Sequence, residues 1–128
     1  MADILYRELS FNIQGAFFEV YKTLGNAHKE SVYQKALVLE LKKRKISYST
    51  QKRISIFYDD EKVGVYVPDI VIEDRVVVEI KARPFLIRND IRQFWYYLKG
   101  STYRLGYLVN FGSTGKVEFL RRVYDTAR

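Results

Sequence analysis

The chain has 128 residues, of which 48% are hydrophobic, and this length and composition suit a single domain, residues 1–128, with one substantial core. Lys and Arg number 22 against 15 Asp and Glu, and the formal charge of +7 favours a polyanionic partner without proving one. The absence of cysteine excludes disulfides, thiolate nucleophiles and cysteine-based zinc sites, so any metal would need oxygen ligands or the lone histidine, His28.

Targeting and membrane signals are absent from the sequence. No uninterrupted apolar stretch approaches the roughly 18 residues that a membrane-spanning helix needs. The opening residues MADILYRELS also lack the basic start and apolar run of a signal peptide. We therefore expect a cytoplasmic protein with no membrane partner.

Two helices are predicted in the first third of the chain. Apolar residues recur at helical spacing from Asp3 to Leu24, and Gly25-Asn26 is a pair suited to a helix stop. A second helix is predicted from Lys29 to Arg44, where the basic residues at its end suit the helix dipole.

Beyond Ile46 the apolar period changes from helical to alternating. Three strands are then predicted, and short polar turns would join them into an antiparallel meander: Gln51–Tyr58, Val63–Ile72 and Arg75–Ala82. A third helix follows from Arg88 to Lys99, and after it come two more strands, Arg104–Phe111 and Lys116–Tyr124. The order ααβββαββ predicts an α/β protein of the α+β type, with about five strands flanked by helices.

Asp69, Glu79 and Lys81 are charged side chains inside apolar stretches of these strands. Side chains alternate between the two faces of a strand, so Glu79 and Lys81 are neighbours on the same face as Val77. Asp69 lies in the preceding strand, which is apolar on both faces and is typical of an internal strand. Burying Asp69 there without a partner would be costly.

The pairing register decides whether Asp69 and Glu79 meet. A two-residue turn at Glu73-Asp74 would leave them on opposite faces of the sheet. A three-residue loop, residues 73–75, would pair them, and a bulge near Pro68 could have the same effect; we predict one of these two irregularities. Two carboxylates that close repel each other, and a divalent cation is the simplest agent that keeps both ionised. The alternative interpretation is that no shared site exists: Glu79 and Lys81 would form the solvated face of an amphipathic strand, and Asp69 would start a turn.

Four stretches resemble, in order, the PD-(D/E)xK nuclease superfamily and, within it, the small GxxExxY family: Glu30–Leu37, Val67–Asp74, Val76–Ala82 and Leu105–Gly112. One departure is that Ala27 stands where the family motif opens with glycine. The resemblance implies a restriction-endonuclease-like core with a central mixed sheet of about five strands. It also implies metal-dependent hydrolysis of phosphodiester bonds in nucleic acid, and we favour DNA over RNA.

The resemblance assigns catalytic roles as well. It implies that Glu30, at the start of the second helix, and Gln93, on the third, point toward a site formed with Asp69, Glu79 and Lys81. Each has a simpler interpretation: Glu30 as a first-turn acid favoured by the helix dipole, and Gln93 as part of a solvated surface. Tyr33 is expected in the core and His28 on the surface.

In this interpretation Asp69 and Glu79 would bind Mg²⁺ or Mn²⁺, together with the Ile80 carbonyl and, through water, Glu30. The cation would polarise a phosphate oxygen and lower the pKa of a bound water. Lys81 would orient that water or stabilise charge on the phosphorus.

Phosphate contacts are expected from four basic residues on or near the third helix: Arg83, Arg88, Arg92 and Lys99. Two other functions stay open. The chain could be a binding or adaptor module that keeps the nuclease fold without turnover. It could also resemble the small Holliday-junction resolvases, which act as homodimers, with the aromatic third helix as the interface.

Overall fold

A computed structural model describes residues 4–124 of the chain. The three helices in this range are α1 (Arg7–Leu24), α2 (Glu30–Lys43) and α3 (Arg88–Gly100). Its seven strands are β1 (Tyr48–Ser49), β2 (Ile54–Tyr58), β3 (Glu61–Tyr66), β4 (Ile70–Ile72), β5 (Val76–Lys81), β6 (Leu105–Asn110) and β7 (Glu118–Val123). Within residues 4–124 no helix is both long enough and apolar enough to cross a bilayer.

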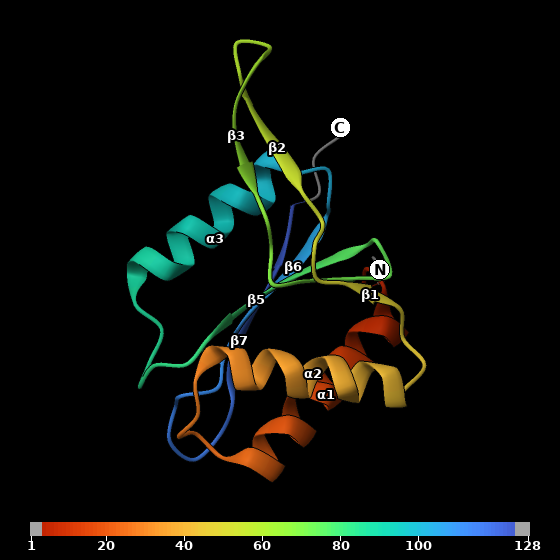
Figure 1. Ribbon diagram of the computed structural model, residues 1–128, viewed down its shortest axis with the longest axis vertical. Coiled ribbons are helices and arrows are strands. Elements are labelled where there is room, and N and C mark those ends of the chain that lie inside the picture. The colour runs from red at the N-terminus through yellow and green to blue at the C-terminus, as the bar shows by residue number, and fades with distance from the viewer. Residues whose placement is uncertain (1–3, 125–128) are drawn as a thin grey trace.

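Five of the strands form one mixed sheet in the order β1-β4-β5-β6-β7. The pair β5 and β6 is parallel, and the other three pairs are antiparallel. Parallel neighbours need a crossover connection, and α3 supplies it between β5 and β6. Figure 1 shows the sheet between α3 on one side and α1 with α2 on the other. The predicted α+β class, with a five-stranded mixed sheet flanked by helices, is confirmed.

The helix boundaries follow local signals in the sequence. Gly25 ends α1 with a φ of 71°, a conformation that favours glycine, and its N–H bonds to the carbonyl of Tyr21. The predicted start of this helix at Asp3 lies outside the described residues, and within them the helix begins at Arg7. The predicted second and third helices are confirmed to within one residue at each end.

The prediction of one strand from Val63 to Ile72 is wrong. Residues 67–69 leave strand geometry, because Pro68 has no N–H to donate to a ladder. The segment before this break, β3, pairs only with β2, whereas β4 enters the main sheet between β1 and β5. The expected three-stranded meander is therefore replaced by two separate hairpins.

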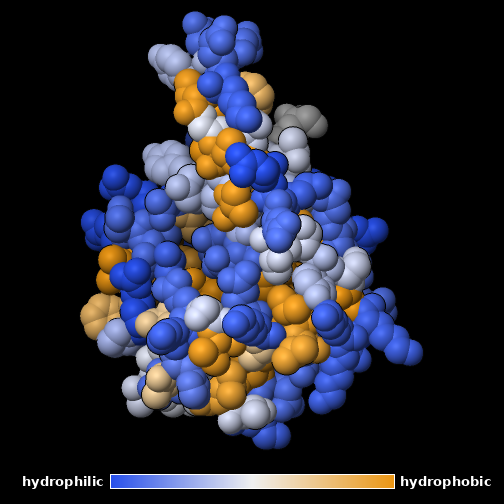
Figure 2. All heavy atoms as spheres, viewed as in Figure 1, coloured by the Kyte–Doolittle hydropathy of each residue, from blue (hydrophilic) through white to orange (hydrophobic). Residues whose placement is uncertain are grey.

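The β2–β3 hairpin projects from the body of the molecule as an arm (Figure 1). Its tip is the turn at Asp59 and Asp60, and both residues have positive φ. Figure 2 shows hydrophobic residues along this arm below a hydrophilic tip, and the exposed apolar ones include Phe57 and Val63. The base of the arm ends at Tyr66, which is buried.

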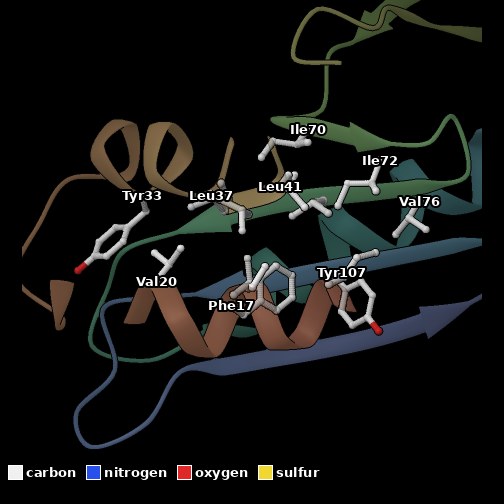
Figure 3. Close-up of a cluster of buried hydrophobic side chains, with 14 of the residues drawn as sticks. Phe17, Val20, Tyr33, Leu37, Leu41, Ile70, Ile72, Val76 and Tyr107 are labelled. Carbon is white, nitrogen blue, oxygen red and sulfur yellow. The ribbon is translucent and has the colours of Figure 1, made fainter. Parts of the chain in front are cut away.

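The main core lies between the sheet and the two N-terminal helices (Figure 3). Phe17 of α1 packs edge-on against Tyr107 of β6, and Tyr33 of α2 stacks on Phe111. A smaller cluster on the opposite face packs under α3: Tyr66, Val71, Val77, Leu98 and Tyr103. Alternate residues of β5 therefore face different layers, and Glu79 and Lys81 share the face of Val77, toward α3.

Candidate active site

The loop between β4 and β5 sets the register on which the site depends. Ile72 pairs with Val76 and Ile70 with Val78, so the loop contains three residues, 73–75. Continuing this register by one position places Asp69 opposite Glu79. Of the two irregularities predicted, the three-residue loop is the one confirmed, and this register puts Asp69 on the face of the sheet that carries Glu79.

Hydrogen bonds lock the two acids together. The backbone N–H of Asp69 donates to Glu79 Oε1 at 3.0 Å, and the N–H of Ile80 donates to Asp69 Oδ2 at 2.7 Å. The side-chain amide of Gln34, on α2, donates to the carbonyl oxygen of Asp69 at 3.0 Å. These bonds fix the start of β4 against the end of β5 and against α2. Among the described residues, Asp69 Oδ1 and Glu79 Oε2 have no hydrogen-bond partner.

Both carboxylates are costly to ionise in this position. Burial, followed by the charge of Asp69, raises the pKa of Glu79 to about 7. Burial also raises the pKa of Asp69, with a further contribution from Glu30, while the Ile80 hydrogen bond and the Lys81 charge oppose the shift. A cation between the two acids would offset the repulsion by Asp69 that contributes to the raised pKa of Glu79.

Tyr66 connects the hairpin arm to this pair of acids. Its hydroxyl donates to Glu79 Oε1 at 2.8 Å, and its ring stacks on Tyr97 of α3 with centroids 4.0 Å apart. Burial and the neighbouring Glu79 charge raise the pKa of Tyr66 far above its usual range. The hydroxyl therefore stays protonated and acts as a donor to the carboxylate.

The Lys81 ammonium lies beside a third acid, Asp90 of α3. Lys81 Nζ is 4.0 Å from Asp90 Oδ1, and Arg83 Nε is 3.2 Å from Asp90 Oδ2. Asp90 is only 7% exposed. Although Lys81 is near enough to lower the pKa of both Asp69 and Glu79, it forms no ion pair with either among the described residues.

The donor set suits a hard divalent cation. Within residues 4–124, Asp69 and Glu79 each present one oxygen without a hydrogen bond, and carboxylate oxygens are the ligands that Mg²⁺ and Mn²⁺ prefer. The N–H of Ile80 points toward Asp69, so its carbonyl leaves the strand on the same edge. Residues 4–124 contain no cluster of three or more His, Asp or Glu side chains arranged for a metal. Any ion here would need backbone and water oxygens besides the two acids.

Comparison with known families agrees with this geometry. A family model described as the PD-(D/E)XK nuclease superfamily matches residues 7–123, which is most of the chain. The protein belongs to the PD-(D/E)XK nuclease superfamily. No curated protein and no solved structure matches the chain. Membership of this superfamily suggests nuclease activity and a nucleic acid substrate, and its members generally use divalent metals.

The two outer residues predicted for this PD-(D/E)XK site lie at its edges. Glu30 is the first residue of α2 and is exposed, yet it is near enough to raise the pKa of Asp69. Gln93 is also exposed, and its amide donates to the Tyr97 hydroxyl at 3.3 Å. Among the described residues, Gln93 is therefore linked to Glu79 only indirectly, through Tyr97 and Tyr66.

Three of the four basic residues predicted to bind phosphate are exposed on α3: Arg88, Arg92 and Lys99. None of them forms an ion pair with another described residue. Arg83 differs, because its guanidinium pairs with Asp90 and its side chain is 37% exposed. The positive charge of Arg83 is therefore partly neutralised by Asp90 of the PD-(D/E)XK protein itself.

Sequence reasoning missed three residues that support the site: Gln34, Tyr66 and Asp90. No local pattern marks Gln34 or Tyr66, because Gln34 bonds to Asp69 35 residues away and Tyr66 bonds to Glu79 13 residues away, across the break after β3. Asp90 had one usable signal: an acid in the first turn of a helix often bonds to the backbone there. The N–H of Ile87 does donate to Asp90 Oδ2, at 3.4 Å. Tyr33, by contrast, is fully buried, as its expected core role requires.

Proposed function

We propose that this PD-(D/E)XK protein is a nuclease of the GxxExxY type that hydrolyses phosphodiester bonds with Mg²⁺ or Mn²⁺, acting on DNA in preference to RNA. One observation carries the proposal: the three-residue loop after β4 puts Asp69 and Glu79 on one face, with Lys81 two residues further along. Superfamily membership supports the same chemistry.

In this proposal two acids bind the cation, and Lys81 acts on the attacking water or on the charge of the phosphate. Asp69 and Glu79 would hold it through their unbonded oxygens, with the Ile80 carbonyl and, through water, Glu30. When bound, the metal supplies a polarised phosphate oxygen and a water of lowered pKa. Lys81 orients that water or stabilises negative charge that develops on the phosphate.

Gln93 and the exposed bases of α3 would act around this centre. Gln93 hydrogen-bonds Tyr97, so it would fix the aromatic stack beside Glu79. Arg88, Arg92 and Lys99 would bind the phosphate backbone as it leaves the site. Because these charges bind the phosphates of DNA and RNA alike, the preference for DNA is tested by comparing cleavage of the two.

The test is cleavage of labelled DNA and RNA by purified protein with Mg²⁺, Mn²⁺ or EDTA. Wild type should cut DNA faster than RNA and only with metal. Asp69→Asn, Glu79→Gln and Lys81→Met should each lower the rate by about a hundredfold or more. Asp60→Asn, at the hairpin tip, serves as the matched charge control and should cut normally.

The other outcomes have distinct meanings. Cleavage by all three site variants at the wild-type rate would refute the assignment. Binding of nucleic acid in EDTA without cleavage under any metal would support a binding module instead. A strong preference for four-way junctions, together with a dimeric mass in solution, would support a resolvase-like homodimer.

A further inference from the structure

Asp90 is a buried acid whose carboxylate is shared by two cations. One oxygen faces Lys81 Nζ at 4.0 Å, and the other forms an ion pair with Arg83 Nε at 3.2 Å. The second oxygen also accepts the Ile87 N–H at the start of α3, where the helix dipole favours negative charge. These contacts hold the Asp90 carboxylate between the start of α3 and the end of β5.

A second set of bonds fixes Arg83, the other partner of Asp90. The side chain of Asn110 is fully buried. It accepts a hydrogen bond from the backbone N–H of Arg83 at 3.0 Å and donates one to the backbone carbonyl of Arg83 at 2.8 Å. Glu118 of β7 then accepts from Asn110 at 3.0 Å and from the N–H of Leu86 at 3.1 Å. The loop that leads from β5 into α3 is thereby tied to β6 and β7, so Asp90 and Lys81 are held at a defined separation.

Three acids therefore lie near the Lys81 ammonium, and in this structure it forms its ion pair with Asp90. Asp69 and Glu79 are close enough for the Lys81 charge to lower the pKa of each, yet Lys81 pairs with neither. A long, flexible ammonium side chain would otherwise lie across these two acids and occupy the oxygens that a cation needs. A lysine there would compete directly with the metal.

We propose that Asp90 is a positioning residue that draws the Lys81 ammonium away from the Asp69–Glu79 pair and so keeps the free oxygens of both acids open to a divalent cation. The proposal rests on the metal site of the proposed function. Lys81 thereby stays beside the site without filling it.

The test measures Mn²⁺ binding in the absence of nucleic acid, by electron paramagnetic resonance of the free ion. The four proteins are wild type, Asp90→Asn, Lys81→Met and the double variant. Asp90→Asn should weaken Mn²⁺ binding by about tenfold, because Lys81 falls onto Asp69 and Glu79. With Lys81→Met that competitor is gone, so adding Asp90→Asn should change the Kd by less than about threefold.

The double variant separates positioning from simple charge loss. If Asp90→Asn weakens Mn²⁺ binding equally with and without Lys81, Asp90 acts only as a distant charge and the proposal is overturned. An unchanged Kd in Asp90→Asn overturns it as well. Asp60→Asn removes the same charge from the exposed hairpin tip, and it should leave the Kd unchanged.

Two further readouts keep the test decisive. If Asp90→Asn fails to fold because Arg83 loses its partner, Asp90→Glu replaces it. This variant moves the carboxylate by one methylene and should cause a smaller loss of Mn²⁺ affinity. Adding Lys81→Met should again abolish that loss. A Kd for Asp90→Glu equal to wild type would overturn the proposal. Wild type that binds no Mn²⁺ would remove the proposed metal site itself and this inference with it, whereas a failure confined to the Asp90 variants leaves the nuclease proposal standing.

Discussion

At the scale of single residues, Glu79 links the stability of the fold to pH. Its pKa is raised from 4.5 to about 7 in the fold by burial and by Asp69. The folded state therefore keeps a proton that the unfolded chain releases. Its contribution to the free energy of unfolding is fully present below about pH 4.5 and is lost as the pH rises through about 7.

We predict that metal-free Glu79→Gln is more stable than wild type at about pH 8, by about 1–2 kcal/mol after allowance for partial exposure. A neutral amide can still accept the hydrogen bonds from Tyr66 and the Asp69 N–H. Urea unfolding in EDTA at about pH 4 and about pH 8 measures the effect, and the two proteins should converge at the lower pH. A variant that keeps the wild-type pH dependence would contradict this prediction.

Tyr66→Phe should shift the pH dependence of cleavage. The hydroxyl stabilises the Glu79 carboxylate, so removing it raises the pKa of Glu79 further. The acid limb of the pH–rate profile should then move to higher pH, because the metal needs the carboxylate form. Tyr58→Phe, on the exposed part of the arm, is the matched control. Superimposable profiles for Tyr66→Phe and wild type would argue against a link between Tyr66 and the chemistry.

At the scale of elements, the site depends on how the end of β6 packs against the loop that follows β5. A Cβ at Gly112 would lie 2.4 Å from the backbone nitrogen of Arg83 and 2.5 Å from its carbonyl oxygen. Backbone atoms cannot rotate away as a flexible side chain can. Close contact at Gly112 thus sets the path of the residues between Lys81 and Asp90.

Gly112→Ala should destabilise the fold by about 3 kcal/mol, because the added methyl forces this loop away from β6. Thermal and urea unfolding give the change. Gly100→Ala provides the comparison: nothing lies within 4 Å of a Cβ there, and at the end of α3 alanine should be neutral or stabilising by up to about 1 kcal/mol. Equal stability of the two variants would show that the approach at Gly112 can relax.

At the scale of the whole molecule, the charge of +7 is distributed so that one side of the sheet carries the candidate site and an exposed basic helix. Arg88, Arg92 and Lys99 lie on α3, which covers the same face as Glu79 and Lys81. Helix α1 lies on the opposite face, so its cations are distant from the proposed path of nucleic acid.

Arg88→Ala and Arg92→Ala should each reduce the slope of log Kd against log salt by about one, because each removes one phosphate contact. Arg83→Ala should change the slope less, since its charge is already paired with Asp90. Lys22→Ala, on the outside of α1, should leave the slope unchanged. Fluorescence anisotropy with labelled DNA in EDTA measures all four, and identical slopes would place the nucleic acid elsewhere.

Local chemistry determined much of this protein in advance. Apolar spacing located the helices, the glycine at 25 ended the first of them, and alternation put Glu79 and Lys81 on one face. The pairing register of Asp69 could be narrowed from the sequence because a strand has a period of two, so the length of the loop decides which face a residue occupies. These are properties of neighbouring residues along one chain.

Tertiary structure alone decided which elements are neighbours. The separate arm and the pairing of β1 with β4 follow from competition between strands for one sheet, which no local pattern records. The same holds for Tyr66, Gln34 and Asp90, since hydrogen bonds and ion pairs between distant segments form only once packing brings their atoms within reach.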